Sequence, residues 1–129
     1  MTCGTTQTIE YVPSALDFRV TRATTNTLTF ILVDDDGNAV DISLDTVKFS
    51  VRDGFGGTEK IPQKENLPGE HTDPENGETQ FTIDKTEIDD ETNRTTETYW
   101  FYEVRRVQPG GEENVFFQGN LIIIPDVGA

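Results

Sequence analysis

The stretch from Val115 to Pro125, which reads Val-Phe-Phe-Gln-Gly-Asn-Leu-Ile-Ile-Ile-Pro, decides the fold of this chain. Aromatic and β-branched residues favour strands, and successive side chains of a strand point to opposite faces. Here both faces are apolar. One set is Val115, Phe117, Leu121 and Ile123, and the opposite set is Phe116, Ile122 and Ile124. In a sandwich of two sheets one face of such a strand fills the core, and the other face needs further cover.

Other segments alternate apolar and polar residues with the period of two that is typical of half-buried strands. The clearest are residues 15–22, 27–33 and 47–52. Residues 99–107 are so rich in aromatic side chains that we expect a strand at the centre of a sheet. Its predicted inward set is Trp100, Tyr102 and Val104.

Segments rich in turn-forming residues separate these predicted strands. Asp34–Asn38 contains an Asp-Gly pair that predicts a tight turn, with Val40–Ile42 as a short return strand. Residues 58–79 hold several prolines and glycines among many charges and predict a long exposed loop. Phe81–Ile83 predicts a short strand, and Thr86–Asp89 one helical turn in which Thr86 accepts a hydrogen bond from a backbone amide.

About seven short strands with almost no helical periodicity predict an all-β fold, a Greek-key β-sandwich. With 129 residues, the chain has the length of one domain with its own core. We predict a polar N-terminal arm over residues 1–14 and a single sandwich domain over residues 15–129.

The formal net charge of −14 argues against binding to nucleic acid or to anionic membranes, because both depend on Lys and Arg. The acidity is concentrated in residues 34–98, which carry eighteen acidic residues against six basic ones. Residues 1–33 and 99–129 are nearly neutral, so we expect the two ends to be the better candidates for protein contact.

The single cysteine, Cys3, cannot form an intramolecular disulfide and has no metal-ligand spacing around it. The first ten residues are polar and do not resemble a targeting segment. Because no apolar run approaches the roughly 20 residues that span a bilayer, we expect a soluble chain.

Several segments in this order resemble the immunoglobulin-like amino-terminal domain of bacteriophage baseplate upper proteins and related small virion proteins. The segments are Asn26–Phe30, Asp36–Ile42, Val47–Arg52, Tyr99–Val104 and Gly119–Ile123. The likeness covers residues 15–127, and the acidic insertion at residues 54–79 departs from the shorter hairpin of that family. The resemblance implies a non-enzymatic structural protein of the virion, assembled in the host cytoplasm, with other virion proteins as partners and no cofactor.

Three patterns suggest chemistry, and each has a simpler reading. Asp34–Asn38 with Asp41 has carboxylates for a calcium loop, but Ala39 stands where the loop needs glycine, so a turn is favoured. His71, the single histidine, has no nucleophile near it in sequence and is read as a solvated loop residue. Neighbouring acids such as Glu112 and Glu113 are expected to face water rather than a substrate cleft. We therefore predict no catalytic or metal site.

The second apolar face of the last strand suggests a protein interface. We expect Phe116, Ile122 and Ile124, together with Tyr11 and Val12 of the arm, to form a subunit contact in a symmetric homo-oligomer. The alternative is that both faces are covered within one chain.

Three binding or structural functions remain open at this point. The first is a tail, baseplate or neck component that acts through protein contacts. The second is a capsid decoration protein. The third is a carbohydrate- or receptor-binding module that uses Phe55 in the glycine-rich segment Asp53–Gly57. An enzyme is the least expected class, since nothing pairs a nucleophile with a base.

Overall fold

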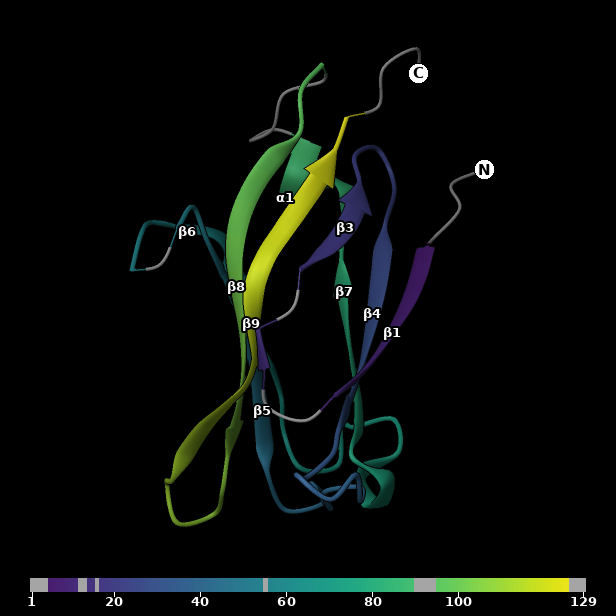
Figure 1. Cartoon of the computed structure of the whole chain (residues 1–129), viewed down its shortest axis with the longest axis vertical. Coiled ribbons are helices and arrows are strands. Elements are labelled where there is room, and N and C mark those ends of the chain that lie inside the picture. The colour runs from purple at the N-terminus through teal and green to yellow at the C-terminus, as the bar shows by residue number, and fades with distance from the viewer. Residues whose placement is uncertain (1–4, 12–13, 16, 55, 90–94, 126–129) are drawn as a thin grey trace.

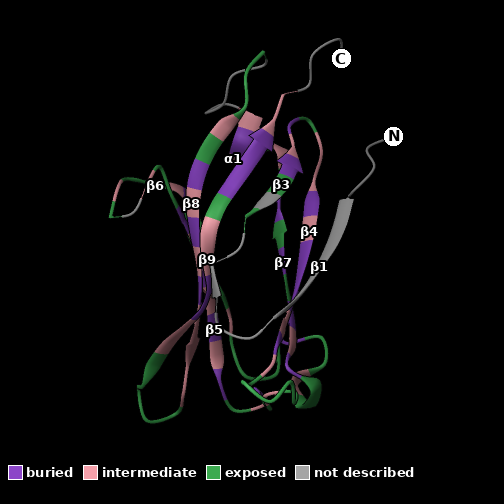
Figure 2. Ribbon diagram, in the orientation of Figure 1, coloured by how far each residue is buried: buried purple, intermediate pink, exposed green. Residues whose placement is uncertain are grey.

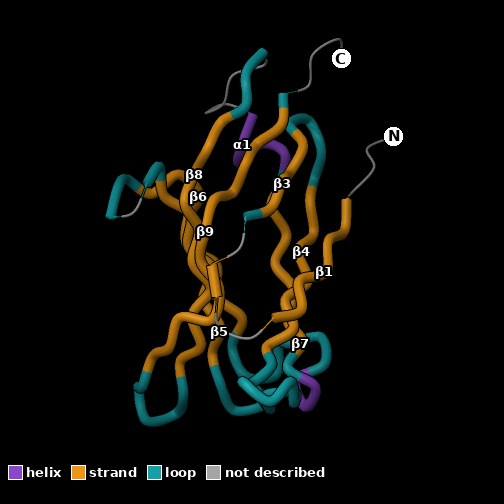
Figure 3. Tube along the Cα trace, viewed as in Figure 1, coloured by secondary structure: helices purple, strands orange, loops and turns teal. Residues whose placement is uncertain are grey.

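The chain forms a β-sandwich in a computed structural model, as the sequence predicts (Figure 1). The structure describes residues 5–11, 14–15, 17–54, 56–89 and 95–125. One sheet has three strands in the order β1-β4-β7, and the other has the order β2-β9-β8-β5-β6, with β3 also paired to β9. Helical structure in the described residues is confined to two short segments between strands (Figure 3).

The elements have the following bounds: β1 Thr5–Tyr11, β2 Ser14–Ala15, β3 Phe18–Thr21, β4 Asn26–Leu32, β5 Thr46–Arg52, β6 Glu59–Asn66, the 3-10 helix η1 Pro74–Asn76, β7 Glu78–Ile83, α1 Lys85–Asp89, β8 Thr98–Val107 and β9 Glu113–Ile124.

The strand order is that of an immunoglobulin-like sandwich. In that fold strands B and E share one sheet while C, F and G share the other. Here β4 and β7 pair in the smaller sheet, and β5, β8 and β9 are consecutive neighbours in the larger one. The short strands β2 and β3 run parallel to β9 and close the edge of the larger sheet.

An aromatic cluster joins the two sheets. Phe30 of β4 lies with its ring centroid 5.3 Å from that of Phe117 on β9 and 6.0 Å from that of Phe49 on β5. Phe49 in turn stacks on Phe81 of β7 at 5.4 Å and lies 6.3 Å from Tyr102 of β8. Aromatic pairs at these separations are favourable beyond the area that they bury. The inner faces of both sheets are therefore held by one continuous core (Figure 2).

The alternation of the sequence gives the correct inward residues on the central strand. Trp100, Tyr102 and Val104 of β8 are all buried, with exposed fractions of 4%, 0% and 0%. The residues between them, Phe101 and Glu103, are intermediate and belong to the outer face. This prediction is confirmed.

The predicted loop over residues 58–79 is wrong, because it contains the edge strand β6 and the helix η1. Prolines are tolerated on edge strands, where no neighbour needs the missing amide. Pro62 lies where the register between β5 and β6 shifts, between the pairs Val51↔Ile61 and Phe49↔Lys64. The bulge, the proline and the charged side chains of β6 protect this edge against pairing with another chain.

Two smaller predictions also need correction. Residues 40–42 do not form a return strand, and the pairing after the turn is an isolated bridge between Val33 and Ala39. The start of α1 is capped by Asp84 and not by Thr86. The Asp84 carboxylate accepts from the Thr86 amide at 3.1 Å, and Glu87 accepts from the Asp84 amide at 2.9 Å. The arrangement is similar to a capping box, but the Asp84 carboxylate accepts from the second helical residue and not from the third.

Part of the predicted N-terminal arm is a strand of the smaller sheet. Residues 5–11 form β1 and run parallel to β4, from the pair Thr5↔Asn26 to the pair Tyr11↔Leu32. The remaining residues of the arm, apart from Ser14, lie outside the described residues. Residues 5–11 therefore share the sheet with β4 and β7.

Candidate functional site

The two apolar faces of β9 are covered largely within one chain. Phe116 and Ile122, expected on an open second face, have exposed fractions of 7% and 6%, and Ile124 is half-buried. The expectation of an open apolar face is therefore wrong for Phe116 and Ile122, and the alternative of internal cover holds for them. Nothing in the structure tests a contact of these residues with a second subunit, which stays a prediction.

A bulge explains the burial of Phe116. The pairs Val104↔Phe117 and Arg105↔Val115 are consecutive on β8, so Phe116 is an extra residue in β9. A bulge of this kind re-aims side chains locally. Phe116 and Phe117, which would point in opposite directions in a regular strand, both belong to the buried core.

A polar bridge accounts for the cover of Ile122. Ile122 pairs with Tyr99 on β8 and with Arg19 on β3, so the three residues form one row across neighbouring strands. Glu97 joins the two ends of this row. It accepts from the Tyr99 hydroxyl at 2.7 Å and from Arg19 Nη1 at 2.7 Å. The hydrogen bond from Tyr99, followed by that from Arg19, holds the pKa of Glu97 below its usual value.

The remaining predicted site residues are Tyr11 and Val12 of the expected contact and Phe55 of the expected ligand loop. The backbone of Tyr11 pairs with Leu32, but its side chain is not among the described parts of the structure. Val12 and Phe55 lie outside the described residues. Gly56, which follows Phe55, lines a surface pocket that is described below.

The segment Asp34–Asn38 is a tight turn, as predicted. The Asp34 carboxylate accepts from the amides of Asp36 and Asn38, each at 2.9 Å, and Gly37 has a φ of +83°. The carboxylate thus stabilises the turn through backbone hydrogen bonds. Within the described residues no group of three or more His, Cys, Asp or Glu residues is arranged to hold a metal ion.

His71 is buried, with an exposed fraction of 8%, so its reading as a solvated residue is wrong. Its Nε2 atom lies 2.8 Å from the carbonyl oxygen of Asp45, and its Nδ1 atom lies 3.0 Å from Oγ1 of Thr79. Because a carbonyl can only accept, Nε2 carries a proton in this arrangement. Asn66 donates to the same Thr79 oxygen at 2.6 Å.

This hydrogen-bonded chain is structural. A threonine beside a histidine has the residue types of a nucleophile and its base. However, Thr79 has an exposed fraction of 0%, so no substrate can reach its hydroxyl. The carboxylate of Asp45 faces Arg106 at 2.6 Å, while His71 contacts the carbonyl of the same residue. These hydrogen bonds connect β6 and β7 to Asp45, the residue before β5.

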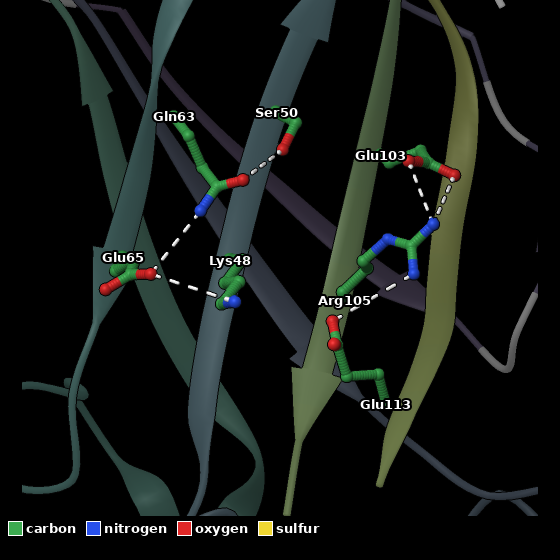
Figure 4. A network of polar contacts seen from close by, with 7 residues as sticks. All are labelled: Lys48, Ser50, Gln63, Glu65, Glu103, Arg105 and Glu113. Carbon is green, nitrogen blue, oxygen red and sulfur yellow. Dashed lines mark hydrogen bonds and ion pairs between the residues drawn. The ribbon is translucent and has the colours of Figure 1, made fainter. Parts of the chain in front are cut away.

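The outer face of the larger sheet carries a network of polar side chains (Figure 4). On β5 and β6, Lys48 lies 3.9 Å from Glu65, Ser50 donates to Gln63 at 3.1 Å, and Gln63 donates to Glu65 at 3.4 Å. Lys48 and Ser50 alternate with buried residues along β5, which places them on the face away from the core.

The same face continues on β8 and β9. One guanidinium nitrogen of Arg105 lies 3.4 Å from either carboxylate oxygen of Glu103, and another lies 4.0 Å from Glu113. In Figure 4 the Arg105 side chain lies between these two acids. Outer-face residues of β8 and β9 therefore form a second charged group beside the first.

A pocket of about 210 Å³ opens on this face and is lined by Arg52, Gly56, Phe101, Glu103 and Arg105. Arg52 is paired with Phe101 across β5 and β8, and Ser50 and Lys48 are paired with Glu103 and Arg105 on the next two rows. Phe101, Glu103 and Arg105 thus line one side of the pocket from a single strand. The turn between β5 and β6 supplies Gly56.

Sequence reasoning did not single out these pocket residues. The signal was present, because the alternation that points Trp100, Tyr102 and Val104 inward also places Phe101, Glu103 and Arg105 outward together. Their approach to Arg52 and Gly56 depends on strand pairing, which the sequence does not display. Of the helices in the described ranges, none is long and apolar enough to cross a membrane.

The fold has a counterpart among solved structures. A scan against protein-family models and a search of curated proteins find no match. A search of solved structures finds the N-terminal domain of phage TP901-1 ORF48, with a TM-score of 0.50 and 12% sequence identity. The match covers 95% of this chain and 98% of that domain. The likeness therefore extends over nearly the whole of both chains and is a likeness of fold.

Proposed function

We propose that this chain is a non-enzymatic structural component of a bacteriophage particle that acts through protein–protein contacts. The observation that carries the proposal is the match in fold to a domain of a phage protein over 95% of this chain and 98% of that domain. A match of this coverage makes the whole sandwich, and not one motif, the shared unit.

The finer proposal is a component of the tail, baseplate or neck. A module of that kind repeats around a symmetric assembly, so each copy must present the same rigid contact surface. The outer face of the larger sheet suits this role because its side chains stand on paired strands and contact one another. The edge strand β6 suits it less, since Pro62 and the bulge interrupt its free edge.

The proposed homo-oligomer can be tested at Ile124. Ile122→Asp would test folding instead of assembly, because Ile122 is buried. Ile124 is half-buried and lies at the end of β9, where a charge is better tolerated. If the end of β9 contacts another subunit, Ile124→Asp lowers the sedimentation coefficient at a fixed concentration without changing the circular dichroism spectrum. A sedimentation coefficient equal to that of a single copy before and after the change would contradict self-association.

The protein composition of purified phage particles tests where this chain is located. Phage particles produced with an epitope-tagged copy of this chain are purified, separated into tails and capsids, and analysed by mass spectrometry and immunogold labelling. The proposal expects the tagged chain in a fixed ratio to the major tail protein. Recovery with capsids would contradict the tail assignment and favour the decoration protein. Absence from complete particles would contradict the structural role itself.

A further inference from the structure

The two sheets have four edges, and both edges of the larger sheet are protected. At one of them lie β2 and β3, which have only two and four residues. The strand at the other, β6, has Pro62 beside a bulge and carries two lysines and two glutamates. Short edge strands, prolines, bulges and charges all hinder pairing with another chain.

The edge of the smaller sheet at β7 is covered by the preceding segment of the chain. The amide of Glu78 donates to the carbonyl of Asp73 at 3.0 Å, and the Asp73 amide donates to the carbonyl of Glu78 at 3.2 Å. Two residues further along β7, Asn66 Nδ2 donates to the Gln80 carbonyl at 2.7 Å. The backbone groups of β7 that face away from β4 are therefore partly satisfied within the chain.

The fourth edge is β1, which has none of these protections. Its seven residues, Thr5–Tyr11, contain no proline, glycine or lysine, and most are the threonine, isoleucine and tyrosine that favour strands. One side of β1 pairs with β4 along its whole length (Figure 1). Among the residues that the structure describes, no strand pairs with its other side. β1 therefore offers an uninterrupted row of backbone donors and acceptors.

The distribution of charge favours β1 as a contact between two copies. Chains with a net charge of −14 repel each other, so a surface that they share must hold few charges. β1 has one charged residue, Glu10. The register of the sheet aligns two uncharged rows across its three strands. One row is Thr6, Thr27 and Thr82, and the next is Thr8, Thr29 and Gln80.

We propose that two copies of this chain pair through β1, around a two-fold axis perpendicular to the smaller sheet. The axis makes the two β1 strands antiparallel. It joins the small sheets into one sheet of six strands, in the order β7-β4-β1-β1-β4-β7. The contact is isologous, because both copies contribute the same strand. The inference rests on the proposed function only in taking repeated copies of the chain as partners, and it leaves the outer face of the larger sheet to other proteins.

The register in which the two strands overlap completely places Thr8 opposite Thr8 of the partner subunit. It places Glu10 opposite Thr6 of the partner subunit, so the two glutamates do not face each other. Like charges directly opposite one another destabilise a pair of strands, and this register avoids them. Position 8 lies at the two-fold axis and is therefore the position at which an added charge meets its own copy.

The experiment measures the dissociation constant of the dimer by sedimentation equilibrium. We expect Thr8→Lys and Thr8→Glu each to raise it about fivefold, because each variant places two like charges at the axis. An equimolar mixture of the two variants should restore dimers, since lysine then faces glutamate. Thr82→Lys is the matched control, because it adds the same charge at an exposed position of β7, the far strand of the same sheet. It should change the constant by less than about twofold.

Two measurements on the unchanged chain locate the contact without any variant. Successive amides of a strand point to opposite edges, so one alternate set within Thr5–Tyr11 faces β4 and the other faces outward. The outward set should exchange hydrogen slowly in the dimer and faster after dilution. Added salt should lower the dissociation constant, because it screens the repulsion between two acidic chains.

Several outcomes would overturn the proposal. One is sedimentation as a single copy up to roughly millimolar concentration. Others are equal effects of Thr82→Lys and Thr8→Lys, a mixture that does not restore dimers, and weaker association at higher salt. Outward amides of β1 whose exchange does not depend on concentration would also overturn it. This exchange decides the matter if the variants at position 8 lose the circular dichroism spectrum of the unchanged chain.

The same measurements separate this contact from the one tested at Ile124. Dissociation by Ile124→Asp without an effect of Thr8→Lys would place the contact at the end of β9 and overturn the pairing of β1. The pairing of β1 requires the opposite result, dissociation by Thr8→Lys with little effect of Ile124→Asp. Neither result bears on the presence of the chain in phage particles, which the composition experiment tests separately.

Discussion

The Nε atom of Arg106 lies 2.6 Å from Oδ2 of Asp45, and the two residues are 61 positions apart in the chain. The pair fixes the segment before β5 to β8 and is well shielded, with side-chain exposed fractions of 19% for Arg106 and 4% for Asp45. We expect Asp45→Ala to lower the free energy of unfolding by about 2 kcal/mol, because it removes a charge-assisted hydrogen bond from a buried position. Urea denaturation with an unchanged m-value measures the loss.

Glu113→Ala is the control for this ion pair. Glu113 lies 4.0 Å from Arg105, and both side chains are about two-fifths exposed, at 43% and 39%. Exposed pairs contribute little, so the change should cost less than about 0.5 kcal/mol. Equal losses in the two variants would contradict the view that burial makes the Asp45 contact strong.

The buried His71 connects the loop after β6 to two other segments, through Asp45 and Thr79. His71→Ala leaves the Asp45 carbonyl and the Thr79 hydroxyl without these partners, and an unsatisfied buried group costs roughly 1–3 kcal/mol. We expect unfolding at a clearly lower urea concentration. Thr72→Ala, at the exposed neighbouring position, should have little effect. An unchanged midpoint for His71→Ala would show that the histidine does not hold these segments together.

Gly77 is required by two separate constraints. It has a φ of +75°, and a Cβ atom there would meet the backbone carbonyl oxygens of Leu32 and of Val40, the latter at 2.9 Å. Positive φ alone costs a residue with a side chain roughly 1–2 kcal/mol, and the clash adds to this. Gly77→Ala should therefore destabilise the fold by more than about 2 kcal/mol.

Two other glycines separate these constraints. Gly69 has a φ of +94°, and nothing lies within 4 Å of the position that a Cβ atom would take, so Gly69→Ala should show the cost of the conformation alone. Gly110 has neither a positive φ nor a close neighbour, so Gly110→Ala should be nearly neutral. The expected order of unfolding midpoints is Gly110→Ala, then Gly69→Ala, then Gly77→Ala as the lowest. Any other order would contradict the assignment of the two costs.

Alternation of apolar and polar residues was sufficient to predict β4 and β5, whereas aromatic content predicted β8 and a run that is apolar on both faces predicted β9. On β5 and β8, burial of one face imposes a period of two on the sequence. β6 could not be found in this way. Ile61 is its one buried residue, and Pro62 with the surrounding charges has the composition of a loop. An edge strand is specified by its pairing partner and by protection of its free side, which leave a weaker pattern than burial does.

The surroundings of the candidate site residues depend still more on contacts between segments that are far apart in the sequence. The interpretation of Phe116 assumed a regular strand, and the extra residue in β9 opposite Val104 and Arg105 changed its surroundings. The burial of His71 depends on partners 8 and 26 positions away. The pocket joins β8 to the turn after β5. None of these relationships leaves a local signal, although the alternation on β8 does identify its outward residues.

Tyr102 gives a prediction for alkaline pH. It has an exposed fraction of 0%, and burial, with a smaller contribution from the charge of Asp17, raises the pKa of its hydroxyl far above the usual value of about 10. Above pH ~10 the unfolded chain releases this proton while the folded chain keeps it, so the unfolded state binds fewer protons. This contribution to stability is therefore complete below pH ~10 and is lost as the pH rises, by up to about 1.4 kcal/mol per pH unit.

Tyr102→Phe removes this titration, so its free energy of unfolding should fall less steeply above pH ~10 than that of the unchanged protein. Urea denaturation at a series of alkaline pH values gives both slopes. Tyr99→Phe is the comparison, because Tyr99 is 55% exposed and its pKa is raised by the hydrogen bond to Glu97. Solvent screens that interaction, so the alkaline slope of Tyr99→Phe should stay close to that of the unchanged protein. Parallel slopes for Tyr102→Phe and the unchanged protein would mean that the buried hydroxyl ionises in the folded state as readily as in the unfolded chain.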